Sequence, residues 1–362
     1  MLTHRNKLKI SFIVLLFIFS YSVFANQNKI INFSKKLEYH IQYKNDVTYL
    51  LNQVISPETM LNNLVKLVAY PDRGSEHESG KNAAYWIRDQ LEIMKRQSGR
   101  TDVNIYEVET KWKYPDGYPA ERIQPSIILS IGTSSTEHPE PAIIIGAHLD
   151  SKSCMFENCI DDEGNDDSTH GAGGAFPGAD DDGSGVVTIM EVARTLLSSN
   201  LQFKKPIYLI WYAAEEAGTL GSYSVVDDFK KKNIPIEAVL QLDMTGYTVN
   251  NDLTMWLSTC NNLDKTLTDY LENLIYTYIP NRFVKRISEC DANSYSDDRA
   301  WVESGFTVAR PLESNYPNPY MHTNQDTLDK LSLEHMTDYL KLTIAFAVEL
   351  AEPKKLDDFS NK

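Results

Sequence analysis

The sequence predicts an α/β protein: a single domain with a mostly parallel central mixed β-sheet flanked by helices on both faces. Downstream of Met94, short apolar runs alternate with segments of helical periodicity, which is typical of βα units. Runs such as Ile143-Ile144-Ile145 show no alternation with polar residues, and this favours strands covered on both faces. A length of 362 residues exceeds a typical domain of ~100–200 residues, but one large α/β unit accounts for it.

The elements follow in order along the chain. Ser56 is a suitable N-cap, with Pro57 at the first helical position and Glu58 in the first turn, so a helix is predicted to begin here. A second helix is predicted after Gly80. Its apolar stripe is Ala84, Ile87, Leu91 and Met94. Strands are then predicted over 127–131, 142–145, 207–212, 238–242 and 307–309. Further helices are predicted over 186–198, 221–231, 263–278, 298–303 and 335–349.

The N-terminal segment has the features of a bacterial Sec-type signal peptide. Arg5, Lys7 and Lys9 precede an apolar run, and Ala25 completes a small-residue cleavage site before Asn26. The run is short for a membrane span of ~20 residues, so a lone N-terminal anchor is the alternative. We therefore expect a secreted or periplasmic protein with no stable membrane association after cleavage. The predicted parts are a signal peptide at 1–25, an N-terminal arm or pro-segment at 26–55, the main domain at 56–352 and a C-terminal tail at 353–362.

The chain is acidic, with 35 Lys and Arg against 50 Asp and Glu. Its formal net charge of −15 becomes −18 without residues 1–25, which hold three bases and no acid. A nucleic-acid-binding protein needs a basic face to neutralise phosphates, so nucleic acid is excluded as a partner. Hydrophobic residues at 42% and charged residues at 23% also exclude a wholly disordered chain.

The four cysteines are expected to form disulfides in an oxidising compartment, where four cysteines allow three connectivities. Cys154 and Cys159 lie five residues apart in one loop and can close a small ring, which leaves Cys260 with Cys290. A cysteine-bound zinc ion is the alternative, but the spacing is not C-x-x-C and no histidine falls at a finger-like offset.

Acids and histidines follow the predicted strands, where ligands gather in open α/β sheets. The segments involved are 148–150 (His-Leu-Asp), 180–182 (Asp-Asp-Asp), 215–216 (Glu-Glu), Asp243 and 322–326 (His-Thr-Asn-Gln-Asp). Each has an ordinary explanation on its own, such as a structural histidine, a solvated acid or a helix cap. Because all five lie at strand ends or directly before a helix, a shared metal site is favoured.

The donor set indicates which metal is bound. Two imidazoles and three carboxylates suit zinc, and they are too few and too nitrogen-rich for calcium. They exceed the three protein ligands of one catalytic zinc ion, whereas two zinc ions that share a bridging carboxylate use five side chains. The sequence therefore predicts two Zn²⁺ ions. The acidic loop 157–167 is an alternative calcium site, but it lacks a glycine at EF-hand spacing.

These motifs resemble those of the secreted bacterial di-zinc leucyl aminopeptidases, in the metallopeptidase family that also contains glutamate carboxypeptidase II. The resemblance covers about residues 64–349. The motifs that carry it are GAHLDS at 146–151, GADDDGSG at 178–185, YAAEE at 212–216, QLDMT at 241–245 and HT-x-x-DT at 322–327. The resemblance implies a fold of the zinc-exopeptidase type and makes 56–352 a zinc aminopeptidase domain.

The resemblance also implies roles for the matching residues. His148 and Asp243 correspond to the ligands of one zinc ion, and Asp181 corresponds to the bridge. Glu216 and His322 correspond to the ligands of the other zinc ion.

The implied reaction removes one residue at a time from the N-termini of peptides or proteins by a zinc-bridging hydroxide. Glu215 matches the general base that passes a proton to the leaving amine. Asp150 matches the acid that orients His148, a role that the H-x-D spacing itself suggests. The family also has a cis peptide after the bridging aspartate, here between Asp181 and Asp182. The protein is expected to act as a monomer.

Specificity stays open because this chain departs from the family pattern. After Cys290 the second cysteine of the family is absent, and Asp298 replaces a histidine. An apolar pocket, or plain core packing, is predicted for Met244, Leu257, Leu312, Tyr316 and Met321. Selection of Lys or Arg, or an ordinary solvated loop, is the alternative suggested by Glu289, Asp291, Asp297, Asp298 and Glu313.

Three other functions are disfavoured. A glutaminyl cyclase-like transferase of the same fold uses one zinc ion, whereas five ligand positions are intact here. A carboxypeptidase needs basic side chains for the substrate carboxylate, and no arginine cluster lies near the motifs. A non-catalytic receptor-like domain is expected to have lost ligands, and none is missing.

Overall fold

The computed structural model describes residues 38–110, 123–132, 139–153, 176–260, 262–288, 295–315 and 318–354. The expectations for the signal peptide, the calcium loop and the end of the tail lie outside these residues. So do those for Cys154, Cys159, Cys290, Glu289, Asp291 and Tyr316. In the part of the chain that is described, no helix is long and apolar enough to cross a membrane.

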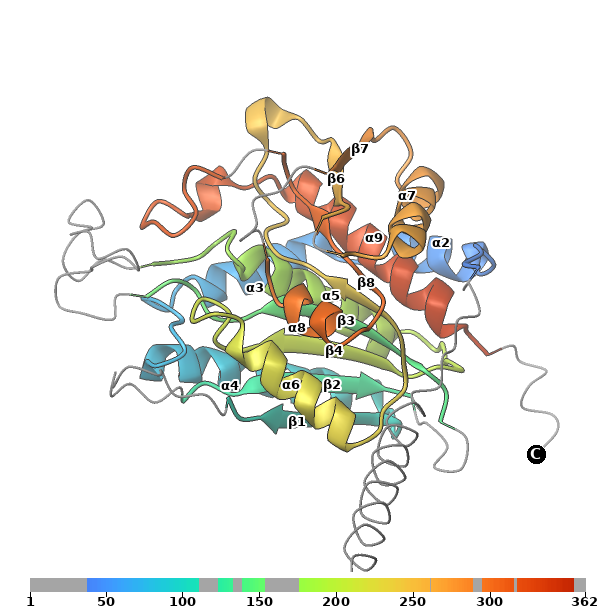
Figure 1. Ribbon diagram of the computed structural model, residues 1–362, viewed down its shortest axis with the longest axis horizontal. Helices are drawn as coiled ribbons and strands as arrows, with labels where there is room; N and C mark the ends of the chain where they lie inside the picture. The colour runs from blue at the N-terminus through green and yellow to red at the C-terminus, as the bar shows by residue number, and fades with distance from the viewer. Residues whose placement is uncertain are drawn as a thin grey trace, which may run out of the picture. The chain divides into compact units, whose positions relative to one another are not determined.

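A six-stranded sheet forms the centre of the domain, with strand order β1-β2-β4-β3-β5-β8 (Figure 1). β3 pairs in parallel with β4 and β5, and β5 pairs in parallel with β8, whereas β2 is antiparallel to β1 and β4. The predicted mixed, mostly parallel sheet is therefore confirmed, with β1 as an addition. The strands are β1 (Val103–Val108), β2 (Ser126–Ile131), β3 (Ala142–His148), β4 (Ile207–Tyr212), β5 (Ile236–Gln241) and β8 (Val308–Ala309).

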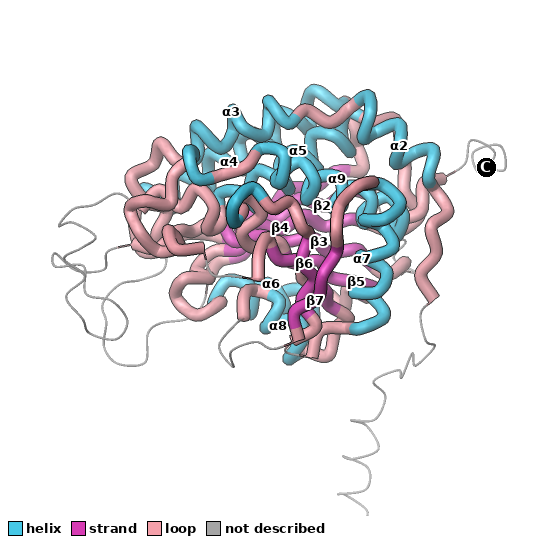
Figure 2. The backbone as a smooth tube through the Cα atoms, turned by 90° about the horizontal axis from the view of Figure 1, so that it is seen from above, coloured by secondary structure: helices cyan, strands magenta, loops and turns pink. Residues whose placement is uncertain are grey.

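Helices cover both faces of this sheet, as predicted (Figure 2). Ile143 and Ile145 of β3 belong to a hydrophobic cluster with α2, α3, α4, α5, α7 and α9, while Ile144 belongs to a second cluster with α6 and α8. All seven residues of β3 are buried, which explains why its sequence shows no polar alternation. The helices are α2 (Lys44–Gln53), α3 (Pro57–Leu67), α4 (Glu78–Ser98), α5 (Gly183–Ser198), α6 (Leu220–Lys231), α7 (Lys265–Tyr278), α8 (Asp298–Glu303) and α9 (Leu333–Ala351), with 3-10 turns at Val249–Asn251 and Leu328–Lys330.

A second sheet of three strands, in the order β7-β6-β9, was not predicted. It consists of β6 (Met255–Ser258), β7 (Val284–Ile287) and β9 (Pro311–Leu312). The strands are only two to four residues long, and β7 carries Lys285 and Arg286 at its centre. Such short runs give no periodic signal.

The structure confirms one of the two predicted helix starts and corrects the other. Ser56 caps α3, because its hydroxyl accepts a hydrogen bond from the Thr59 N–H at 3.2 Å, and Pro57 is the first helical residue. The second helix, predicted to follow Gly80, begins at Glu78 and contains the glycine. A Cβ at Gly80 would lie 2.1 Å from the Gly74 carbonyl oxygen, so the glycine permits close packing on the preceding loop rather than marking a helix start.

The compact unit begins at Tyr39 rather than at residue 56. Part of the predicted arm or pro-segment is therefore the helix α2, whose Val47 and Leu50 are fully buried in the core. The Glu349 carboxylate of α9 accepts hydrogen bonds from the N–H groups of Gln42 at 2.7 Å and Tyr43 at 3.0 Å. These contacts make residues 39–53 part of the folded domain.

We expect Leu50→Ala to lower the free energy of unfolding by about 2–5 kcal/mol, because a fully buried leucine leaves a cavity. Tyr49→Ala on the same helix is the matched control, since Tyr49 is 58% exposed. Urea unfolding followed by circular dichroism measures both variants. Equal stability of the two would mean that α2 does not contribute to the core.

The predicted C-terminal tail also starts later than expected. Pro353 pairs with Phe203, and the Lys354 N–H donates to the Gln202 carbonyl at 2.7 Å. Residues 353 and 354 thus belong to the folded domain.

Candidate metal centre

The candidate residues come together at the carboxyl ends of the three central strands and the start of α5. His148 is the last residue of β3, Glu215 and Glu216 follow β4, and Asp243 follows β5. Asp181 lies in the turn that leads into α5, and His322 lies in the loop beyond β9. Parallel strands place their carboxyl ends at one edge of a sheet, so residues as far apart in sequence as His148 and Asp243 meet there.

Asp181 lies between the two histidines. Its Oδ1 atom is 3.0 Å from Nε2 of His148, and its Oδ2 atom is 3.0 Å from Nε2 of His322. One carboxylate therefore faces two imidazoles with different oxygens, which is the geometry of a bridging ligand.

Each imidazole has a second carboxylate neighbour. Glu216 Oε2 is 3.2 Å from Nε2 of His322, and Asp243 Oδ1 is 3.5 Å from Nε2 of His148. The donor atoms of Asp181, Glu216 and His322 all lie within 4.8 Å of one another. The five predicted ligand positions thus lie together, with the Asp181 carboxylate between the two histidines.

The donor set fits a bound cation. Glu216 Oε1 is buried without a hydrogen-bond partner among the described residues, so a cation at this position would satisfy it. Burial lowers the pKa of His322, but the Glu216 and Asp181 carboxylates outweigh that effect and raise it to about 11. The crowded carboxylates therefore favour positive charge at this position, which a bound cation would supply.

Asp182 also lies beside His148 and Asp243, and its donor atoms fall within the same 4.8 Å. Its carboxylate, however, accepts backbone hydrogen bonds from Gly185 at 3.0 Å, Met244 at 3.1 Å and His148 at 3.1 Å. Asp182 caps α5 and ties three site segments together, so Asp181 is the better ligand for this half-site. The peptide bond between Asp181 and Asp182 is cis, as the family resemblance implied.

Asp150 holds the segment that carries the predicted base. Its carboxylate oxygens accept the N–H groups of Glu215 at 3.0 Å and Glu216 at 3.1 Å. Its carboxylate lies 3.6 Å from Nδ1 of His148, whereas its own backbone carbonyl lies closer, at 3.1 Å. The orienting contact to His148 is thus made mainly by the main chain of Asp150, and the side chain fixes Glu215 and Glu216.

The Glu215 carboxyl interacts with the charged side chains of the same site. Burial raises the pKa of its carboxyl well above the usual range, His148 lowers it, and Asp297, Glu216 and Asp243 raise it further. A carboxylate with a raised pKa is a better proton acceptor near neutral pH.

Asp326 also belongs to the site, although the sequence motif that contains it indicated no role for it. Its two carboxylate oxygens accept the N–H groups of Asp180 at 2.9 Å and Asp181 at 3.0 Å. Because Asp326 follows His322 by four residues, it links the His322 loop to the bridging aspartate. The signal available in the sequence was its place in the HT-x-x-DT motif.

Of the acids suggested for Lys or Arg selection, the three that the structure describes, Asp297, Asp298 and Glu313, are buried. Asp298 is buried and pairs with the buried Arg310 at 3.0 Å. Glu313 is buried and accepts the N–H groups of Gly246 at 3.1 Å and Tyr247 at 2.7 Å. Asp297 is fully buried.

Among the predicted apolar pocket residues, Leu257 is fully buried in the core, so core packing accounts for it. Met244, Leu312 and Met321 are half-buried. Of the described residues that were predicted to line an apolar pocket, these three have exposed surface that a ligand could contact.

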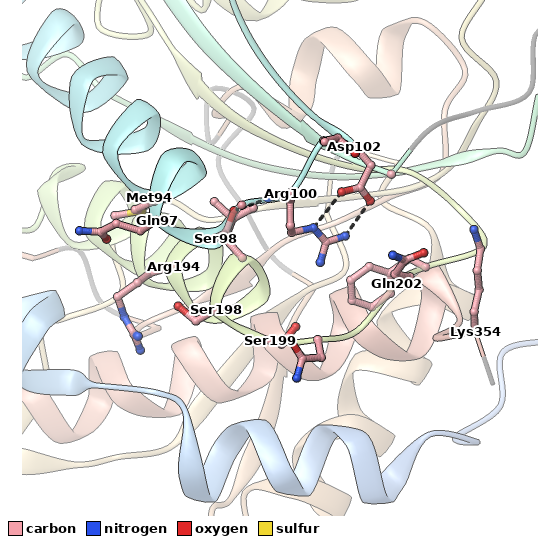
Figure 3. A pocket seen from close by; sticks show the side chains of 16 residues that line it. Met94, Gln97, Ser98, Arg100, Asp102, Arg194, Ser198, Ser199, Gln202 and Lys354 are labelled. Carbon is pink, nitrogen blue, oxygen red and sulfur yellow. Dashed lines mark hydrogen bonds and ion pairs between the residues drawn. The ribbon is translucent and has the colours of Figure 1, made fainter. Parts of the chain in front are cut away.

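A cavity of about 720 Å³ lies elsewhere, at the C-terminal ends of α4 and α5 (Figure 3). Its wall includes Arg194, Lys354 and the ion pair of Arg100 with Asp102, at 2.7 Å. α5 has 16 residues and spans about 24 Å, and Asp182 caps its other end. The cavity is therefore separate from the candidate metal centre.

A central sheet whose strand ends gather histidines and carboxylates around one aspartate is typical of metal-dependent hydrolases. Residues 127–347 match peptidase family M28, and the chain belongs to this family. It is 32% identical over 323 residues to leucine aminopeptidase 1 of Coccidioides posadasii, covering 86% of this chain and 75% of that protein.

Two solved structures from Legionella pneumophila are similar as well. The LapA aminopeptidase is 39% identical with a TM-score of 0.75, covering 88% of this chain and 78% of that one. LapB is 37% identical with a TM-score of 0.74, covering 86% and 76%. The protein is a zinc-dependent aminopeptidase of family M28.

Proposed function

We propose that the protein is a secreted or periplasmic aminopeptidase with two zinc ions. His148 and Asp243 would hold one ion, Glu216 and His322 would hold the other, and Asp181 would bridge them. The observation that carries this proposal is the placement of the two Asp181 oxygens, each 3.0 Å from Nε2 of a different histidine.

The residues around this centre support a hydrolytic mechanism. Zinc, when bound, supplies a hydroxide nucleophile near neutral pH and polarises the scissile carbonyl. Glu215 accepts the proton of the attacking water and delivers it to the leaving amine. Asp150 holds Glu215 in place through its backbone N–H, and the surrounding carboxylates attract the protonated α-amino group of the substrate. An enzyme that anchors that amine releases one residue at a time.

We infer that the enzyme prefers an apolar N-terminal residue. Asp298 and Glu313 already have partners, so neither of them offers a free carboxylate to a basic side chain. Met244, Leu312 and Met321 remain as apolar surface. The name of the fungal relative, leucine aminopeptidase, agrees with this preference.

Three measurements test the proposed function: the preference among substrates, the dependence of turnover on metal, and the number of zinc ions per chain. Leucyl- and phenylalanyl-nitroanilides are expected to be cleaved faster than the lysyl and arginyl compounds, and a chelator is expected to stop turnover until zinc is restored. Elemental analysis is expected to find two zinc ions per chain. Turnover that resists the chelator would contradict a zinc mechanism, and one zinc ion per chain would favour a cyclase-like site.

We further propose that residues 1–25 are removed on export and that the protein is a monomer. We also propose that Cys260 pairs with Cys290 and that Cys154 pairs with Cys159. Mass spectrometry of the mature, unreduced protein tests the cleavage site and both pairings, and sedimentation tests the oligomeric state.

A further inference from the structure

Arg73 is a fully buried arginine in the loop between α3 and α4, with a side chain that is 0% exposed. Burial lowers the pKa of its guanidinium, while the carboxylates of Asp326, Asp150 and Asp182 oppose that effect. A guanidinium remains protonated in proteins, so this loop places a permanent positive charge behind the metal centre. Placing a charge inside a protein is costly unless its donors are satisfied.

All three nitrogens of the Arg73 side chain donate to backbone carbonyls near the metal centre. Nε donates to Leu149 at 2.9 Å, Nη2 donates to Gly178 at 2.8 Å, and Nη1 donates to Pro177. Leu149 lies directly after His148, the last residue of β3. Gly178 lies three residues before Asp181. One planar group therefore joins the two segments that carry these ligands.

The surroundings of Arg73 hold this link in place. Its N–H donates to the Ser151 hydroxyl at 2.9 Å, and that hydroxyl donates to the Phe176 carbonyl at 3.0 Å. The Gln124 amide donates to the Arg73 carbonyl at 2.9 Å. Gly178 has φ +51°, and a Cβ there would lie 2.9 Å from Nη2 of Arg73. The same Cβ would lie 2.4 Å from the Asp181 carbonyl oxygen, so the turn that carries the Gly178 acceptor requires a glycine.

We propose that Arg73 is a positioning residue of the zinc centre, which fixes the His148 segment against the Asp181 segment so that their ligand atoms meet. This inference rests on the proposed zinc site. The positive charge of Arg73 offsets part of the repulsion among the site carboxylates before metal binds. Lysine cannot replace it, because a single ammonium lacks the planar fork that reaches carbonyls on both segments.

Arg73→Lys tests this role, with Arg194→Lys as the matched control. Arg194 also donates to a backbone carbonyl, that of Val54 at 2.5 Å, and pairs with the buried Glu191. It lies 12 residues along α5 from the Asp182 cap, about 18 Å away. We expect Arg73→Lys to raise the zinc dissociation constant about 10–100-fold, as the loss of a residue behind metal ligands typically does. Arg194→Lys is expected to lower the melting temperature without changing zinc affinity.

Competition with a chromophoric chelator measures the zinc affinity, and circular dichroism measures the melting temperature of each metal-free variant. Should Arg73→Lys fail to fold, Ser151→Ala takes its place, with a smaller loss of zinc affinity expected. Wild-type zinc affinity in the folded Arg73 variant, or in Ser151→Ala where that variant is used, would overturn the proposal and leave Arg73 a purely structural role. Failure of the wild-type protein to bind two zinc ions would instead contradict the proposed function.

Discussion

Replacing Glu215 with glutamine is expected to lower kcat by about 10²–10⁴ while zinc content and fold stay unchanged. The amide has nearly the same shape as the carboxylate but cannot accept the proton of the attacking water. The backbone N–H of residue 215 still donates to Asp150, so the segment after β4 keeps its place. Steady-state rates on leucyl-nitroanilide, together with elemental analysis for zinc, measure the two effects separately.

Glu78→Gln is the control for this change, because the Glu78 side chain is 72% exposed at the start of α4. It is expected to keep full activity. Full activity in Glu215→Gln would remove Glu215 from the proton transfer. Loss of zinc from that variant would make Glu215 a ligand rather than a base.

Asp181→Asn is expected to reduce the bound zinc from two ions per chain to one or none. The amide keeps one oxygen near one histidine, but its NH₂ group repels a cation at the other. The loss of affinity should exceed the ~10–100-fold cost of removing a residue behind the ligands. Elemental analysis after dialysis gives the stoichiometry, and chelator competition gives the affinity.

Asp182→Asn is the comparison that distinguishes the bridging role of Asp181 from the structural role of its neighbour. Asp182 accepts three backbone hydrogen bonds, so its substitution is expected to reduce stability more than zinc stoichiometry. Asp227→Asn on α6, an exposed position, is expected to change neither. Loss of zinc in Asp182→Asn with retention in Asp181→Asn would reverse the assignment of the bridge.

The link between Asp150 and Glu215 illustrates what sequence spacing reveals and what it conceals. The H-x-D spacing pointed to a partner for His148, and the His148 ring does lie beside residue 150. Its closer contact is the backbone carbonyl at 3.1 Å, whereas the Asp150 side chain reaches across to β4 and binds two N–H groups. Spacing along one strand could not reveal a bond between two strands.

The acids near the pocket show the same limit. For Asp298 and Glu313, the sequence suggested either solvated acids or a site for basic substrates. Both are buried, one against Arg310 and the other on backbone N–H groups. Their partners lie 12 and 66 or more residues away, beyond any local pattern.

The sequence by itself determined β2, β3, β4, β5 and β8 of the central sheet, the helices α3 to α9, and which residues gather at the strand ends. Apolar runs without alternation identify strands buried on both faces, and the residues that directly follow such strands meet at one edge. Five ligand positions and a candidate base could therefore be named from local patterns and a family resemblance.

Only the tertiary structure decided how those residues are held. Arg73, Asp182 and Asp326 act through hydrogen bonds with the backbone of distant segments. Backbone N–H and carbonyl groups leave no signature in the sequence of those segments. The helix α2 also depends on tertiary contacts. Val47 and Leu50 are buried in a cluster that includes α9, and Glu349 of α9 accepts a hydrogen bond from the backbone just before α2. Local sequence fixes which side chains face the site, whereas the geometry of the site depends on contacts that form only when the chain is folded.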